Sequence, residues 1–185
     1  MTATPRVLMD AGKMDRTLAR MAAEIRERES DTLAVVGIRT RGVHLAARLR
    51  DKLQRIDDRQ VDFGILDINL YRDDLSMVAD HPVLRKTEIS FPVSGRRLVL
   101  VDDVLYTGRT IRAALDALTD LGRPTAIQLA VLVDRGLREV PIQPDFIGMA
   151  VPTQADQHVR VLVREEDGVD RVELGERVLP KREKP

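Results

Sequence analysis

Two adjacent carboxylates, Asp102 and Asp103, follow a short apolar run and precede a loop that contains one glycine. The run at 98–101 is typical of a strand buried on both faces, and the sequence predicts that this strand ends at Asp102. Carboxylates repel phosphate but accept hydrogen bonds. The pair therefore suits the vicinal hydroxyls of a sugar or a divalent cation.

The loop at 104–108 leads into residues 110–118, whose apolar positions have helical spacing. Backbone N–H groups at a helix N-terminus, together with the positive end of the helix dipole, attract an anion. Gly108 lets the backbone approach a phosphate closely, and Thr107 and Thr110 add hydroxyl donors. A phosphate at the helix and a diol at the strand end together indicate a ribose 5-phosphate site.

The same residues also allow an ordinary structural interpretation. Taken singly, Asp102 can be a strand-end residue, Asp103 a turn former and Gly108 a turn glycine. The coincidence of an acidic pair, a glycine loop and a helix start favours the phosphate site. The sequence holds neither a Walker loop nor a dinucleotide fingerprint that would bind phosphate in another way.

A second polar loop, from Arg39 to Gly42, follows the apolar run at 33–38. Its two guanidinium groups and its hydroxyl suit a polyanion. Taken alone, this loop could equally be a solvated charged turn.

The motif at 101–110 resembles the phosphoribosyl pyrophosphate (PRPP) signature of type I phosphoribosyltransferases. Within that group the chain resembles the PyrR family, whose members are pyrimidine operon attenuators and also uracil phosphoribosyltransferases. The similarity covers about residues 14–163, and the separate motifs occur in the family's order. The segments that carry it are 70–76, 122–124 and 128–136.

The resemblance implies that uracil and PRPP react to give UMP and pyrophosphate, with Mg2+ held mainly through PRPP and no firm protein ligand. Asp102 and Asp103 would bind the ribose hydroxyls, and Arg72, in a mobile segment, would close over the leaving pyrophosphate. These are the expected catalytic residues. The expected pyrophosphate loop consists of Arg39, Thr40, Arg41 and Gly42. The expected loop for the 5-phosphate, called the phosphate loop below, consists of Val104, Leu105, Tyr106, Thr107, Gly108, Arg109 and Thr110. The residues expected over the base are Asp134, Arg135, Phe146 and Ile147.

Two classes of function stay open: an enzyme, and an RNA-binding regulator that senses UMP or UTP with little catalytic activity. The intact signature favours retained chemistry. Regulators of the family carry a histidine on the first helix where Ala23 stands here, and basic or polar groups where Leu137, Gln143 and Met149 stand. We therefore expect weak or altered binding to pyrimidine operon leader RNA. The candidate RNA contacts, which fit a solvated helix face equally well, are Lys13, Arg16, Arg20 and Arg28.

The composition of the chain limits the classes of protein to which it can belong. A chain of 185 residues, 43% hydrophobic and 32% charged, fits one globular domain over residues 1–185. The sequence has no run of about 20 apolar residues that could cross a membrane and no apolar leader, so the cytoplasm is the expected location by default. The absence of cysteine does not constrain the redox compartment. Zero net charge excludes a strongly basic global field for nucleic acid, although a local patch is possible. The family resemblance implies a homodimer or a larger homo-oligomer.

Alternating apolar runs and helical patterns predict an α/β protein with the type I phosphoribosyltransferase fold: a central, mostly parallel sheet, helices on both faces and a small C-terminal β-rich hood. The strand-end loops at 39–42, 102–110 and 134–136 should open on one edge of the sheet. Residues 71–91 should form a mobile loop over the site, or else a surface excursion. Further helices are expected at 13–29 and 43–53, and further extended segments at 63–71, 126–133 and 146–151. The hood is expected at 134–175, with a hairpin of 159–163 and 169–174 around an Asp167-Gly168 turn. A frayed tail is expected at 180–185.

Overall fold

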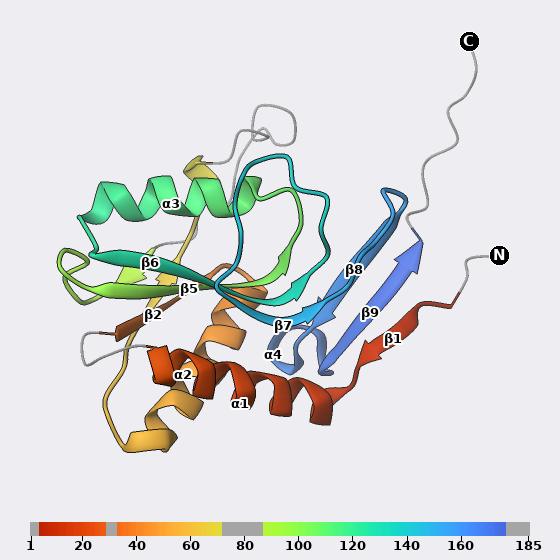
Figure 1. Cartoon of the computed structure of the whole chain (residues 1–185), viewed down its shortest axis with the longest axis horizontal. Coiled ribbons are helices and arrows are strands. Elements are labelled where there is room, and N and C mark those ends of the chain that lie inside the picture. The colour runs from red at the N-terminus through yellow and green to blue at the C-terminus, as the bar shows by residue number, and fades with distance from the viewer. Residues whose placement is uncertain (1–3, 29–32, 72–86, 177–185) are drawn as a thin grey trace, which may run out of the picture.

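A six-stranded sheet forms the centre of the protein (Figure 1), of which the computed structural model describes residues 4–28, 33–71 and 87–176. The strand order is β4-β3-β2-β5-β6-β7, and only β4 at the edge runs antiparallel to its neighbour. The predicted α/β class with a mostly parallel sheet is confirmed. The bounds are β2 Leu33–Ile38, β3 Asp62–Leu66, β4 Glu88–Ile89, β5 Arg97–Leu105, β6 Ala126–Asp134 and β7 Phe146–Ala150.

Helices cover both faces of this sheet (Figure 1). α1 (Ala11–Arg28) and α2 (Arg41–Asp57) lie on one face and α3 (Arg109–Leu121) on the other, beside the short 3-10 helix Asn69–Tyr71. Because both faces are covered, all six residues of β2 are buried, as the unbroken apolar run predicted. The structure thus has two apolar cores, one between the sheet and α1 and α2, the other under α3.

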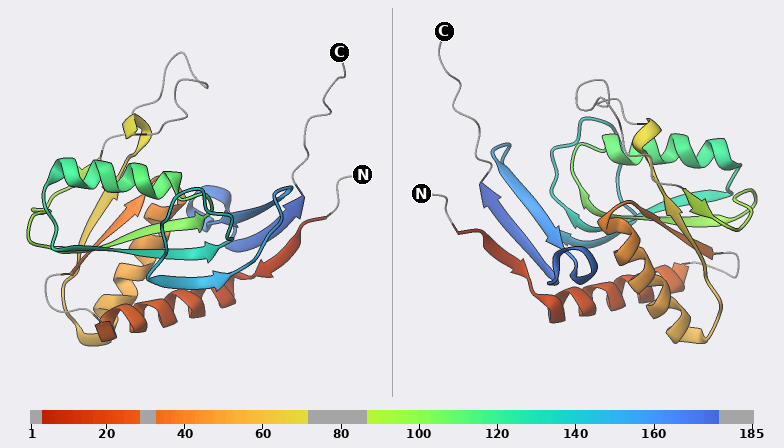
Figure 2. Two further views of the ribbon diagram at one scale, coloured as in Figure 1. Left: turned by 45° about the horizontal axis from the view of Figure 1, so that its top comes forward. Right: turned by 180° about the vertical axis from the view of Figure 1, so that it is seen from behind.

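A second, three-stranded antiparallel sheet stands beside the carboxyl ends of the main strands (Figure 2). Its order is β1-β9-β8, with β1 at Arg6–Met9, β8 at Gln157–Leu162 and β9 at Arg171–Glu176. The predicted C-terminal hairpin is confirmed, but a short helix, α4 (Arg164–Asp167), replaces the expected two-residue turn. One feature was not foreseen: β1 joins the hood from the other end of the chain. β7 belongs to the main sheet, as the alternating apolar runs indicated, although it lies within the range given for the hood.

The strand that carries the acidic pair is longer than predicted. The expectation that it ends at Asp102 is wrong, because β5 continues to Leu105, which pairs with Asp134 of β6. Val104 and Leu105 are apolar and pack against the two cores, so the strand has no reason to end at the carboxylates. The acidic pair therefore lies within a paired strand rather than in a free loop.

The helix ends also differ from the expected ranges. α1 begins at Ala11, where Asp10 Oδ1 accepts a hydrogen bond from the Lys13 N–H at 2.7 Å, a typical N-terminal cap. α2 continues to Asp57, and the next residue, Asp58, has the left-handed conformation of a helix end. α3 ends at Leu121, immediately before Gly122. Residues 72–86, with Arg72, and the tail at 180–185 lie outside the described residues.

Candidate active site

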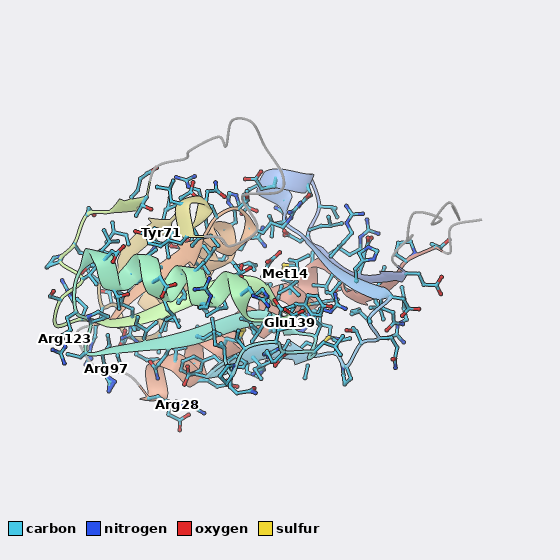
Figure 3. The ribbon with its side chains drawn as sticks, turned by 90° about the horizontal axis from the view of Figure 1, so that it is seen from above. Met14, Arg28, Tyr71, Arg97, Arg123 and Glu139 are labelled. Carbon is cyan, nitrogen blue, oxygen red and sulfur yellow. The ribbon has the colours of Figure 1, made fainter. Side chains whose placement is uncertain are left out.

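Three loops meet at the carboxyl edge of the main sheet. They follow β2, β5 and β6, which are adjacent and parallel, so the loops at 39–42, 105–108 and 134–136 emerge side by side. The expected common edge is confirmed. In Figure 3 the label of Glu139, near the start of α3, marks this end of the molecule. Arg97 and Arg123 lie at the opposite edge of the sheet.

The loop after β2 is packed tightly against the acidic pair. A β-carbon at Gly42 would lie 2.7 Å from the Val101 carbonyl oxygen and 3.3 Å from Asp102 Oδ1. Such distances leave no room for a larger residue, so glycine allows the start of α2 to touch β5. The backbone of Thr40 and Arg41 is thereby held next to Asp102 and Asp103.

Asp102 and Asp103 are held by backbone N–H groups of their own strand. Asp102 is 7% exposed, and its Oδ1 accepts from the Asp103 N–H at 2.9 Å. Asp103 Oδ1 accepts from the Val104 N–H at 2.9 Å. Burial raises the pKa of Asp102 well above its ordinary value, and the neighbouring Asp103 charge raises it further. Burial also raises the pKa of Asp103, while the positive charge of Arg41 opposes that rise.

The loop between β5 and α3 has the geometry of an anion site. Gly108, immediately before α3, has a φ of +88°, which glycine adopts without strain. Its conformation is supported by the loop between β6 and β7, since the Thr107 carbonyl accepts from the N–H groups of Glu139 at 2.9 Å and Val140 at 3.2 Å. The first N–H groups of a helix have no partner within the helix, and in α3 the first of them, on Arg109, donates to Thr107 Oγ1 at 3.3 Å.

Arg138 is the principal residue that sequence reasoning missed. Its Nη1 donates to the Tyr106 carbonyl at 2.9 Å, its Nη2 to Asp134 Oδ2 at 2.7 Å and its Nε to the Ile142 carbonyl at 2.9 Å. One guanidinium thus joins the phosphate loop to the loop after β6. The spacing of Asp134 and Arg138 was a visible signal, but nothing in the sequence indicated that Tyr106 would be the third partner.

The side chains of Asp134 and Arg135 are engaged within the protein. Asp134 Oδ1 accepts from the Gly136 N–H at 2.9 Å, and its other oxygen binds Arg138. Arg135 is 6% exposed; its guanidinium carbon lies 4.0 Å from the centre of the Tyr106 ring, and its Nη2 donates to the Gln157 carbonyl at 2.7 Å. Arg135 therefore links the phosphate loop to the start of β8.

The expectation that Phe146 covers the base is wrong. Phe146 is fully buried in the core beside α1 and pairs with Ala130, whereas the carboxyl end of β7 is at Ala150. Ile147 follows it at the amino end of the strand. The resemblance supplied these residue types without the direction of their side chains, and that of Phe146 lies in the core.

The basic residues predicted to bind RNA have partners inside the protein at three of four positions. Arg20 donates to the carbonyls of Ile147 at 2.9 Å and Gly148 at 2.7 Å, and so attaches α1 to β7. Arg28 lies over the Phe146 ring at 5.1 Å, and Lys13 donates to the Leu8 carbonyl at 3.0 Å. Arg16 is exposed. These contacts give α1 a packing role that its charge pattern did not show.

The two arginines of the loop after β2 point to different neighbours. Arg39 Nη2 binds Glu88 of β4 at 2.8 Å, while Arg41 makes a two-pronged contact with Asp167 of α4, at 3.0 Å from Nε and 2.7 Å from Nη2. The peptide bond between Arg39 and Thr40 is cis. Arg41 is thus the arginine of this loop that lies beside the acidic pair.

Comparison with known proteins identifies the family. The phosphoribosyl transferase domain family matches residues 8–161. The "Bifunctional protein PyrR" of Deinococcus radiodurans is 53% identical over 176 residues, which cover 94% of this chain and 96% of that protein. That of Thermus thermophilus is 56% identical over 172 residues, covering 92% and 95%. The chain belongs to the PyrR family.

Solved structures agree on the fold of this PyrR family member. A hypoxanthine phosphoribosyltransferase of Trypanosoma cruzi superposes with a TM-score of 0.69 at 14% identity, covering 93% of this chain and 97% of that one. One from Staphylococcus aureus gives 0.68 at 16% identity, covering 91% and 90%. The type I phosphoribosyltransferase fold is therefore confirmed. Among the described residues no helix is long and apolar enough to cross a membrane.

Proposed function

We propose that this chain is a uracil phosphoribosyltransferase that converts uracil and PRPP to UMP and pyrophosphate. The observation that supports it most is the juxtaposition of two unlike sites at one sheet edge. The N-terminus of α3 offers N–H donors to a phosphate, and Asp102 and Asp103, a few residues earlier, offer acceptors to ribose hydroxyls. The choice of uracil rests on the PyrR relatives.

In this reaction the protein mainly positions the substrates and stabilises the charges that develop on them. The bond from ribose C1 to pyrophosphate lengthens, positive charge develops on the ribose ring and negative charge on the leaving group, and a base nitrogen attacks C1. The N–H groups before and within the first turn of α3, with the hydroxyls of Thr107 and Thr110, hold the 5-phosphate. Arg41 balances the charge that develops on pyrophosphate, and the carboxylates of Asp102 and Asp103 stabilise the ring.

Mg2+ would be held at this site mainly by the oxygens of the substrate, PRPP. The described residues contain no cluster of three or more metal-ligating side chains. The oxygen pair of Asp102 and Asp103 is chemically suited to Mg2+, and PRPP oxygens would supply further ligands. When bound, Mg2+ neutralises the pyrophosphate charge.

Replacing Arg41 tests the assignment of the pyrophosphate loop. We expect Arg41→Ala to raise the KM for PRPP about tenfold and to lower kcat about tenfold, because the leaving group loses a charged partner. The assay is UMP formation with uracil and a panel of other bases. Arg50→Ala is the matched control, since Arg50 lies on the same helix but binds its neighbour Asp51. Unchanged kinetics in Arg41→Ala would remove Arg41 from the site.

We further propose that regulation of pyrimidine operon RNA is weak or altered in this chain. Arg20, Arg28 and Lys13 support this, because their contacts with β7, Phe146 and Leu8 leave them less free to follow phosphates. In a filter-binding titration against a leader hairpin recognised by PyrR relatives, we expect weak capture with little response to UMP or UTP. Tight, sequence-specific, nucleotide-sensitive capture would contradict this.

A further inference from the structure

The acidic helix of the hood is attached to the first two turns of α2 by a row of polar contacts, made of arginine ion pairs and one histidine hydrogen bond. Glu166 lies 2.7 Å from His44, and Arg48 Nη2 lies 2.6 Å from both Glu165 and Asp170. The contact at the end of the row joins Asp167 to Arg41. The hood is therefore connected directly to the loop to which we assign pyrophosphate binding.

Asp167 is itself rigidly held. Its Oδ2 accepts from the Val163 N–H at 2.9 Å, and its own N–H donates to the Val163 carbonyl at 2.7 Å. Gly168, with a φ of +74°, ends the helix immediately afterwards through a bond to Arg164. A carboxylate that is held by nearby backbone groups can in turn hold the orientation of a side chain that binds to it.

The geometry leaves part of the Arg41 guanidinium open to a ligand. Of its five N–H donors, Nε–H and one on Nη2 go to Asp167, and within the part of the chain that the structure describes the other three have no hydrogen-bond partner. The side chain is 37% exposed, whereas that of Asp167 is 15% exposed. The hydrogen bond to Arg41 lowers the pKa of Asp167, so its carboxylate is charged at neutral pH. Arg41 thus has one edge held by the hood and another edge free.

We propose that Asp167 is a positioning residue for pyrophosphate: by holding one edge of the Arg41 guanidinium, it directs the free edge toward the pyrophosphate group of PRPP. The hood thereby takes part in binding the leaving group as well as in covering the site. Holding a flexible arginine before the ligand arrives removes an ordering cost from binding. The inference rests on the proposed function.

The test compares ligands that do and do not contain pyrophosphate. We expect Asp167→Asn to weaken binding of PRPP with Mg2+, and of pyrophosphate with Mg2+, by roughly tenfold in calorimetric titrations. Binding of UMP, which lacks pyrophosphate, should be unchanged. Glu166→Gln, on the same helix, is the control and should leave PRPP affinity unchanged, because Glu166 binds His44 rather than Arg41.

A double-mutant cycle separates positioning from general damage to the hood. In an Arg41→Ala background, Asp167→Asn should cause no further loss of PRPP affinity, because the residue through which it acts is gone. Additive losses, or equal losses for PRPP and UMP, would overturn the inference, as would unchanged or tighter PRPP binding in Asp167→Asn. A wild-type protein that binds no PRPP would instead contradict the proposed function.

Discussion

Asp102→Asn should nearly abolish UMP synthesis while making the free protein more stable. The loss, about 100-fold in kcat/KM, is expected because a neutral amide binds ribose hydroxyls and Mg2+ less strongly than a carboxylate as positive charge develops. The gain in stability is expected because Asp102 is buried beside a second carboxyl and its pKa is raised. Asparagine keeps the oxygen that accepts from the Asp103 N–H.

The pH dependence of this effect has a defined sign. A carboxyl whose pKa is higher in the folded than in the unfolded state binds its proton more tightly when folded. Its contribution to stability is therefore complete below the ordinary carboxyl pKa and is lost as pH rises toward the raised value. The Tm of Asp102→Asn should exceed that of wild type by a margin that grows as pH increases from about 4.

Thermal melts across a pH series, together with UMP assays, check this prediction. Asp51→Asn serves as a control, because Asp51 is an exposed carboxylate on α2 paired with its neighbour Arg50. A lower Tm for Asp102→Asn at neutral pH would show that the carboxylate stabilises the fold, and full activity would remove it from the site.

Gly108→Ala should disable the phosphate site. Alanine would be strained at a φ of +88°, and its β-carbon would lie 2.6 Å from Val140 Cγ2 in the loop between β6 and β7. Either the Val140 side chain or the loop itself must then shift, next to the hydrogen bonds by which the Thr107 carbonyl holds residues 139–140. We expect UMP affinity and kcat/KM for PRPP to fall about 100-fold.

Gly95→Ala provides a matched control for backbone strain. Gly95 also has a left-handed φ, +79°, but a β-carbon there meets nothing within 4 Å. It precedes β5, at the amino end of the strand, away from the site. That variant should lose about 1 kcal/mol of stability and keep its affinity for UMP. If both variants bind UMP like wild type, the loop before α3 is not the phosphate site.

The sequence was most informative where one local segment held the whole signal. The acidic pair, Gly108 and the start of α3 lie within a dozen residues, and their common sheet edge followed from the parallel order of the strands. Contacts across the chain had no such signal. β1 is four residues long and is stabilised by β9, from the other end of the chain. A segment that short is defined by its partner rather than by its own pattern.

The predictions that were wrong failed because they depended on contacts between distant parts of the chain. Phe146 was given a role from the family resemblance, but its side chain is fully buried in the core beside α1. β5 was ended at Asp102 on the basis of charge, although pairing with β6 continues to Leu105. Arg41 and Asp167 are 126 residues apart, and only the docking of α4 on α2 brings them together. Such long-range contacts depend on tertiary packing, which no local pattern encodes.

The most direct test of the central claim is the stoichiometry of the reaction. Purified wild-type protein, incubated with uracil, PRPP and Mg2+, should release UMP and pyrophosphate in a ratio of one to one, and Asp102→Asn should release almost none of either. Wild-type protein that folds and binds PRPP but forms no UMP would contradict the assignment and leave the regulator without catalysis as the better description.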